Sequence, residues 1–340
     1  MADPAGRKRI TIYDLAMLAE ASPSTVSAVL SGNWRKRRIS ERMAQRIQEL
    51  ARQHGYALNM QARALRKERS GIIGMIVPMY DNRYFSSIAQ TFEQMARARG
   101  LLPIVTSTQR DPALEAEAAS AMLAYQVETL ICTGTTDPDQ IHDLCAAAGV
   151  PTLNLDLPGT KAASVISDNY AGALTLTRQA LATAKGEGQF IFLGGRATDH
   201  NTRERIRGFL DAHTEQGLSV DPANILTGGY AADKAYEALS HHLASTGRLP
   251  PGLFVASTIT LEGVVRFFGD HPDLNMTELS IACFDWDPFV AVLGKNIFMV
   301  RQDVTAMMRH IFDLVDGRAE APTLIEVPLV PMEFDDDAPT

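Results

Sequence analysis

Apolar residues from Ile72 onward gather in short, nearly continuous runs that alternate with segments of helical spacing. Runs rich in Val, Ile, Leu and Phe are typical of parallel strands that helices cover on both faces. We expect strands within 72–78, 101–107, 127–134, 150–156, 189–195, 252–258 and 279–285, and helices over 84–98, 114–125 and 171–184. This alternation predicts βαβ units and an α/β fold of doubly wound parallel sheets.

More than ten such elements over about 260 residues are too many for one sheet of ordinary size. We therefore expect two similar lobes with a cleft between them. In doubly wound sheets, ligands bind beyond the carboxyl ends of the strands. Polar residues that follow the predicted strands are for this reason the first candidates for a binding site.

The first 56 residues show no strand pattern and predict three short helices. The first helix opens at Thr11, where Asp14 resembles the second half of a capping box. The second opens at Ser22, with Pro23 at the first helical position, where its missing N–H is harmless. A tight turn separates these two helices, and a third helix lies within 40–55. Two helices joined by a tight turn and followed by a third predict an all-α helix-turn-helix bundle.

Charge is distributed unevenly between the two parts of the chain. The net charge of −8 divides into +8 for residues 1–70, with 14 Lys and Arg against 6 Asp and Glu, and −16 for residues 71–340. A small basic module on an acidic body is suited to docking on the phosphate backbone of nucleic acid. The three cysteines, Cys132, Cys145 and Cys283, lie in apolar contexts and predict buried thiols in a reducing compartment.

The outer face of the second helix carries small hydroxyl residues, which can reach base edges and phosphates. Apolar residues pack the first two helices together, namely Ile12, Leu15, Ala16, Ala19, Val26, Val29 and Leu30. The candidate DNA contacts of this region are Thr11, Ser22, Pro23, Ser24, Thr25, Ser27 and Ala28. A purely structural three-helix bundle would show the same pattern, so this stretch alone leaves both interpretations open.

The motif IYDLAxLAxxSxSTVSxVLSG, followed by ISERMAQRI and ARALR, resembles the lactose-repressor (LacI) family, and the resemblance covers essentially the whole chain. It implies a helix-turn-helix headpiece joined to a two-lobed core like that of periplasmic binding proteins. In that family the second helix enters the major groove. Many members carry Arg where this chain has Ala28, which cannot make a bidentate guanine contact, so we expect the operator to differ at that base pair.

The segment 32–40, GNWRKRRIS, is longer than the usual family loop and carries four basic residues, Arg35, Lys36, Arg37 and Arg38. A charge run is often only a solvated surface, but its place beside the recognition helix favours phosphate contacts. Fructose repressors of the family have a similarly long loop, and the resemblance is closest to that branch.

Residues 58–70 resemble the family's hinge segment, which becomes helical on operator DNA and inserts a leucine into the minor groove. The resemblance assigns that wedge to Leu65 and places Asn59, Ala62 and Arg63 on the same face. A charged linker without a role in DNA binding is the alternative.

The effector cleft is marked by further resemblances, most of them at strand ends. The segment PMYDNRYF, residues 78–85, resembles the family's PDxxNPFF, with Met79 and Arg83 as departures. Another departure is Ser257-Thr258, where relatives often have Asn-Asp. Any strand-end Asp could instead cap the following helix. The candidate effector contacts are Asp81, Asn82, Arg83, Tyr84, Asp156, Asp168, Asn169, Arg205, Ser257, Asp285 and Gln302.

This set of side chains suits a polyol, because carboxylates accept hydrogen bonds from hydroxyls and an arginine donates a planar fork. The resemblance to the fructose branch makes fructose 1-phosphate the first candidate effector. Three carboxylates, those of Asp156, Asp168 and Asp285, would repel its phosphate unless Arg83 and Arg205 face it.

The sequence therefore predicts a homodimeric, cytoplasmic repressor of sugar genes that binds a near-palindromic operator and a sugar or sugar phosphate. It predicts no cofactor, no metal and no membrane span. The expected domains are 1–57, the hinge 58–70 and a core over 71–334. Within the core, the first lobe is expected over about 71–168 and 303–322, and the second over about 169–302 and 323–334.

Two alternatives use the same fold. An enzyme would need catalytic spacing, and the chain lacks GxSxG, GxxxxGK[ST], HExxH and GxGxxG motifs. Asp199, His200 and Asp287 could be imagined as acid–base groups, but nothing in their spacing requires it. A solute-binding transport protein would need an export signal and would have no use for a basic headpiece.

Overall fold

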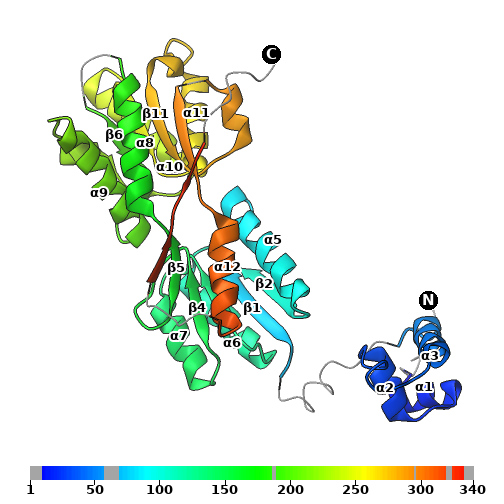
Figure 1. Cartoon of the computed structure of the whole chain (residues 1–340). Coiled ribbons are helices and arrows are strands. Elements are labelled where there is room, and N and C mark those ends of the chain that lie inside the picture. Colours follow the sequence, from blue (N-terminus) through cyan, green and yellow to red (C-terminus); the bar gives the residue numbers. More distant parts are fainter. Residues whose placement is uncertain (1–9, 57–68, 186–188, 295, 319–323, 333–340) are drawn as a thin grey trace, which may run out of the picture. The chain divides into compact units, whose positions relative to one another are not determined.

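The computed structural model describes residues 10–56, 69–185, 189–294, 296–318 and 324–332. The chain divides into two compact units, Met1–Ser70 and Gly71–Thr340, and each is described by itself below. The division falls where the hinge segment was expected to end. We refer to the first unit as the headpiece and to the second as the core unit (Figure 1).

The headpiece consists of α1 (Ile12–Ala19), α2 (Pro23–Leu30) and α3 (Glu41–Gln53). Helix α1 begins with the predicted capping box, in which Asp14 and Thr11 bond each other's backbone N–H. Glu20 ends the helix in the left-handed conformation, with φ of 54°, and so makes the tight turn into α2. The buried side chains that join the three helices include Leu15, Val26 and Ile47. The helix-turn-helix bundle is confirmed.

The first sheet of the core unit has the strand order β13-β5-β4-β3-β1-β2, and all its pairs are parallel. One face is covered by α5 and α12, which lie side by side in Figure 1, and the other by α6 and α7. The strands are β1 (Ile72–Val77), β2 (Leu102–Ser107), β3 (Leu130–Thr133), β4 (Thr152–Leu155), β5 (Ser164–Ser167) and β13 (Leu324–Val327). The helices are α5 (Arg83–Ala98), α6 (Pro112–Ala124), α7 (Pro138–Ala147) and α12 (Val304–Val315).

The second sheet has the order β14-β12-β11-β10-β6-β8, parallel except for the β12–β14 pair. Helices α8 and α9 cover one face, and α10 and α11 the other. The strands are β6 (Ile191–Leu193), β8 (Ile225–Leu226), β10 (Gly252–Val255), β11 (Ser280–Phe284), β12 (Ile297–Arg301) and β14 (Val330–Met332). The helices are α8 (Asn169–Thr183), α9 (His200–Glu215), α10 (Ala232–Thr246) and α11 (Thr258–Asp270). Short strands β7 (Gly195–Arg196) and β9 (Gly228–Gly229) pair separately, and 3-10 turns η1 (Pro222–Asn224), η2 (Met276–Glu278) and η3 (Pro288–Val292) complete this part.

The two sheets with their helices form the two predicted lobes. The chain passes between them after β5, after β12 and after β13. One predicted boundary is wrong: residues 324–327 were expected in the second lobe, but β13 pairs with β5 in the first sheet. Strand β13 adds to the edge of the first sheet beside β5. The chain returns to the second lobe only with β14. The first lobe thus comprises 71–167 and 303–327, and the second 168–302 and 328–332, within the described residues.

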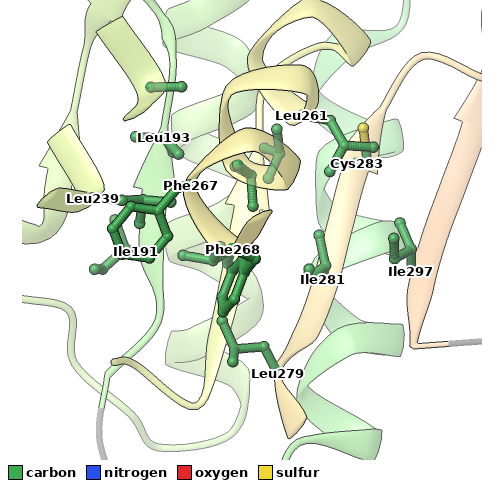
Figure 2. Packing of buried hydrophobic residues seen from close by; sticks show 14 of the residues in the cluster. Ile191, Leu193, Leu239, Leu261, Phe267, Phe268, Leu279, Ile281, Cys283 and Ile297 are labelled. Carbon is green, nitrogen blue, oxygen red and sulfur yellow. The ribbon is translucent and has the colours of Figure 1, made fainter. Parts of the chain in front are cut away.

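The largest apolar cluster of the second lobe lies between α10, α11 and the sheet. Figure 2 shows Phe267 and Phe268 of α11 above Ile191, Ile281 and neighbouring strand residues. These strand side chains come from the nearly continuous apolar runs seen in the sequence, and the two covered faces explain why those runs show no polar alternation. The three cysteines are free and buried, as expected.

Candidate functional site

A cavity in the core unit is lined from both lobes at the carboxyl ends of their strands. Of the eleven predicted effector contacts, the lining includes Asn82, Tyr84, Asp156, Arg205, Ser257, Asp285 and Gln302. Two of them occupy matching places: Asp156 directly follows β4 and Asp285 directly follows β11. Both have left-handed backbones, with φ of 73° and 74°, which is uncommon for residues other than glycine. Each lobe therefore contributes a buried strand-end carboxylate to the cavity.

Asp156 is the centre of a hydrogen-bond network that includes both lobes. Its Oδ1 accepts from the Tyr84 hydroxyl at 3.1 Å and, across the cleft, from Asn201 Nδ2 at 3.2 Å. Burial raises the pKa of Asp156 to about 6, although the charges of Arg110 and Arg205 act in the opposite direction. This carboxyl group is consequently able to gain or lose its proton close to neutral pH.

Arg205 is 3% exposed and is held in place before any ligand binds. Its Nε donates to Asn169 Oδ1 at 2.8 Å, its Nη1 donates to the Ala256 carbonyl at 2.6 Å, and its guanidinium lies 3.6 Å from the ring centre of Phe284. Helix α9 can approach α8 this closely because Gly208 has no side chain: a Cβ there would lie 2.5 Å from the Tyr170 carbonyl oxygen. The close approach fixes Arg205 beside Asn169.

A buried polar chain connects the cavity to two of the crossover segments. Gln302, between β12 and α12, donates from Nε2 to Asp285 Oδ1 at 2.5 Å. Its Oε1 accepts from the Ser167 hydroxyl at 2.6 Å, at the end of β5. Burial also raises the pKa of Asp285, while Arg205 and the Gln302 hydrogen bond lower it. A ligand that contacts Asp285 is thus connected, through these two hydrogen bonds, to the segments in which the chain crosses between the lobes.

Four predicted contacts do not line this cavity. Asp81 is exposed, and Asp168 caps α8 by accepting from Ala171 N at 2.9 Å, which is the alternative role considered for strand-end carboxylates. Asn169 is buried and holds Arg205. Arg83, expected to face a phosphate, instead donates to Asp287 Oδ2 of the other lobe at 2.8 Å. Its side chain is 49% exposed.

Eight lining residues were not among the predicted contacts: Met79, Phe85, Arg110, Leu157, Asp199, Asn201, Tyr230 and Ile259. Arg110 follows the predicted strand 101–107, so the strand-end rule could have found it. Asp199 was considered only as an acid–base group. Whether the other six residues line the cavity depends on how the two lobes face each other, and the sequence pattern carries no information about that arrangement.

The headpiece presents most of the predicted DNA-binding residues at its surface. Ser22 caps α2 through Thr25 N at 3.1 Å, and its hydroxyl also bonds those of Ser24 and Thr25. Thr11, Ser22 and Ser24 are exposed, and Pro23, Thr25 and Ser27 are partly exposed. All four basic loop residues, Arg35, Lys36, Arg37 and Arg38, are exposed as well.

Ala28 differs from the prediction, because it is only 5% exposed. The long loop after α2 folds back: Asn33 N donates to the Ala28 carbonyl at 2.9 Å, and Trp34 packs against the headpiece core. At this exposure the Ala28 methyl group is not presented to a base. The hinge residues Asn59, Ala62, Arg63 and Leu65 lie outside the described residues.

The described residues also bear on metal binding and on membrane insertion. No group of three or more His, Cys, Asp or Glu side chains there could hold a metal ion. None of the helices described is long and apolar enough to cross a membrane.

Comparison with known proteins distinguishes among regulators, transport proteins and enzymes. Residues 73–287 match the periplasmic binding protein domain, and residues 11–59 match the lacI family of bacterial regulatory proteins. The sucrose operon repressor of Klebsiella pneumoniae is 30% identical over 321 residues, 93% of this chain and 95% of that protein. The chain belongs to the lacI family. It is a DNA-binding transcription regulator and not an enzyme.

Two further similarities support the family assignment and the fold. The ribitol operon repressor of Klebsiella aerogenes is 57% identical over 193 residues, 56% of this lacI-family chain and 72% of that protein. The crystal structure of the lac repressor dimer bound to operator and the anti-inducer ONPF superposes with a TM-score of 0.80 at 21% identity, and covers 96% of this chain and 98% of that one. The second similarity shows that the fold extends over both units.

Proposed function

We propose that this lacI-family protein is the homodimeric repressor of an operon for polyol catabolism and that a small uncharged polyol, of which ribitol is the first candidate, binds in the cleft. The observation that carries the proposal is the composition of the cavity. Three carboxylates, Asp156, Asp199 and Asp285, line it together with amide, hydroxyl and aromatic side chains. Such a lining offers acceptors and donors to hydroxyl groups and ring faces to C–H groups. The 57% identity to a ribitol operon repressor supports this choice.

The charges in the cavity disfavour a sugar phosphate such as fructose 1-phosphate. A phosphate group carries a charge of about −1.5 to −2 at neutral pH and needs cations that are free to face it. Arg205 already donates to Asn169 and to the Ala256 carbonyl. Arg83 pairs with Asp287 and does not line the cavity. Arg110 does line it, but its Nη1 lies 4.0 Å from Asp199 Oδ2. The two arginines of the lining are therefore outnumbered by its three carboxylates. An uncharged polyol avoids repulsion from the three carboxylates, so it fits this site better than a phosphate ester does.

The DNA-binding role is assigned to the headpiece. The exposed face of α2 and the basic loop residues Arg35 to Arg38 are proposed to contact the major groove and the phosphates. A two-fold dimer would place two headpieces on the half-sites of a near-palindromic operator. We assign Leu65 and its neighbours in the hinge to the minor groove, as the family resemblance implies. We propose a cytoplasmic location, since the protein must reach its operator.

The effector is proposed to control DNA binding through closure of the lobes. Asn201 and Asp156 already contact each other across the cleft, and Gln302 connects Asp285 to the crossover. A ligand that favours one lobe arrangement shifts the equilibrium between arrangements only by its differential affinity for them. The factor by which the effector changes operator affinity must therefore equal the factor by which operator DNA changes effector affinity.

Calorimetric titration of the full chain with ribitol, neutral sugars and fructose 1-phosphate tests the proposed ligand class. We expect ribitol or a related polyol to bind more tightly than the phosphate ester. Tighter binding of fructose 1-phosphate would overturn the assignment to a neutral polyol. Repeating the titration with operator DNA present tests the coupling: an effector that releases DNA must bind the complex more weakly by the factor it imposes on operator affinity.

A further inference from the structure

The loop that connects β2 to α6 directs Arg110 into the cavity. Gln109 and Arg110 both have left-handed backbones, with φ of 54° and 57°, which is uncommon for two consecutive residues other than glycine. The loop is held on both sides, since Gln109 N donates to the Pro78 carbonyl at 2.7 Å and Asp111 caps α6 through Ala113 N at 2.8 Å. The neighbouring structure thus enforces this turn.

The guanidinium of Arg110 lies between aromatic rings that belong to different lobes. Its Cζ is 5.6 Å from the ring centre of Phe85 in the first lobe and 5.5 Å from that of Tyr230 in the second. Its Nη1 is 3.5 Å from the Gly134 carbonyl oxygen and 4.0 Å from Asp199 Oδ2 across the cleft. The side chain is 14% exposed. Arg110 consequently contacts both walls of the cavity at once.

One donor of this guanidinium has no partner. Within the described residues, the buried Arg110 Nε–H makes no hydrogen bond. A buried unpaired donor on a charged group is unfavourable, and it is a feature that calls for an explanation. Asp199 does not satisfy this donor, because its 4.0 Å contact is with Arg110 Nη1 and not with Nε. Asp199 Oδ2 accepts from Arg196 Nε at the shorter distance of 3.0 Å. An oxygen atom in the cavity would satisfy the free donor.

We propose that Arg110 is a specificity-determining residue of the effector site, whose Nε–H donates to one hydroxyl oxygen of a bound polyol. The inference rests on the proposed function and names one contact within it. Since the guanidinium touches both lobes, the contact also favours the closed arrangement. A polyol whose hydroxyl points elsewhere would leave the donor unpaired, so the residue distinguishes stereoisomers as well as contributing affinity.

The test compares Arg110→Gln and Arg110→Lys with the unchanged full-length protein, by titration with ribitol, xylitol and D-arabinitol and by thermal unfolding without ligand. We expect Arg110→Gln to weaken ribitol binding by about 10- to 100-fold, in the range of hydrogen bonds from charged donors, and to reduce the ratio of Kd values between the pentitols. Arg110→Lys keeps the charge but lacks the fork, so it should also lose discrimination. The Tm of the unliganded variants should be unchanged or higher, because an unpaired buried donor has been removed.

Arg196→Gln is the matched control, because Arg196 pairs with the same Asp199 but does not line the cavity. It should leave the ratios between pentitols unchanged. Two results would overturn the assignment of Arg110: unaltered ribitol affinity and selectivity in Arg110→Gln, or a fall in the unliganded Tm with no change in selectivity, which indicates a structural ion pair. Failure of the unchanged protein to bind any of the three pentitols would overturn the proposed ligand class and the Arg110 contact together.

Discussion

Arg83 and Asp287 connect the two lobes at the edge of the cleft, where Arg83 Nε donates to Asp287 Oδ2 at 2.8 Å. Asp287 is held for this role, because its Oδ1 accepts from Phe289 N at 2.9 Å and so caps η3. Arg83 is the first residue of α5, so the pair joins a helix start of the first lobe to a turn of the second. Because the two residues belong to different lobes, the bond depends on how the lobes face each other.

Arg83→Ala should therefore weaken effector binding only modestly, by less than about fivefold, since partly exposed ion pairs contribute about 0.2–1 kcal/mol. Titration at low and high salt measures the effect, which should diminish as salt increases. Arg97→Ala on the same helix, whose partner Glu93 lies in its own lobe, serves as the control and should have no effect. A loss confined to phosphorylated ligands would show that Arg83 leaves Asp287 to hold a phosphate.

Ribitol affinity should fall as the pH is lowered through about 6, the value to which burial raises the pKa of Asp156. The ionised carboxylate accepts hydrogen bonds from hydroxyls, so a proton competes with the ligand, and affinity decreases by up to about tenfold per pH unit below that value. Asp156→Asn should bind more weakly at neutral pH and lose this dependence. Asp285→Asn should retain it. An unchanged pH profile in Asp156→Asn would assign the titration to another group.

His213 should make the core unit less stable at acidic pH. Its Nδ1 bonds the Phe209 carbonyl at 2.8 Å, and the ring lies 4.4 Å from that of Phe209 and 5.6 Å from that of Phe190, measured between centroids. Burial lowers the pKa of His213 below its usual value, so the unfolded chain takes up a proton first. The stability contributed by the neutral ring is present above about pH 6.5 and decreases below it, by at most about 1.4 kcal/mol per pH unit.

Urea unfolding between about pH 7.5 and 5 tests this, because His213→Leu should show a flatter dependence of unfolding free energy on pH than the unchanged protein. His310→Leu, at an exposed position of α12, is the control for the loss of a histidine. Parallel curves for the unchanged protein and His213→Leu would exclude His213 as the responsible group.

Gly208→Ala should destabilise the core unit by about 1–3 kcal/mol or more, because the new Cβ would collide with backbone atoms of α8. The helices must separate, and Arg205, nearly one turn earlier on α9, should move away from Asn169. We expect a lower Tm together with weaker ribitol binding. Gly269→Ala on α11 meets no atom within 4 Å and should leave both measurements unchanged or raise the Tm slightly. Retention of full ribitol affinity in Gly208→Ala would separate helix packing from the placement of Arg205.

Operator binding should depend steeply on salt, with a slope of about −0.9 in log affinity per phosphate neutralised. Arg37→Ala, in the exposed basic loop, should weaken specific and non-specific DNA binding equally and reduce the slope by about 1. Arg52→Ala, whose side chain pairs with Glu49 on α3, should leave the slope unchanged. Fluorescence anisotropy across a salt series measures it, and an unaltered slope in Arg37→Ala would exclude a phosphate contact there.

The sequence patterns predicted those elements whose formation depends on residues close together in the chain. The capping box at Thr11, the proline start of α2 and the strands around Ile73 and Phe254 follow from neighbouring residues. Five strands of the two sheets were not among those expected, namely β5, β8, β12, β13 and β14. A short strand at the edge of a sheet depends on a partner far away in the sequence, as β13 depends on β5. The same limit explains the misplaced lobe boundary.

The candidate site divides in the same way. Asp156 and Asp285 could be predicted because they follow strands, but Asp168 also follows a strand and caps a helix. Only the packing of the lobes decides between these roles. Ala28 is buried next to a loop whose Asn33 N–H returns to the Ala28 carbonyl. Arg110 depends on a left-handed turn and on a ring from each lobe. Neither arrangement leaves a pattern in the chain.

The three crossings between the lobes also determine the order in which the protein can be completed during synthesis. Helix α12, whose Met307, Met308, Ile311 and Phe312 fill the apolar interior of the first lobe, is translated only after nearly all of the second lobe. Strand β13 follows later still. Until then the emerging first lobe has one sheet face covered by α5 but not by α12, and an open sheet edge, surfaces that favour aggregation and chaperone binding. A nonsense mutation shortly before residue 303 would leave the cell with this unfinished lobe permanently, although every residue of the β1–β5 region would be intact.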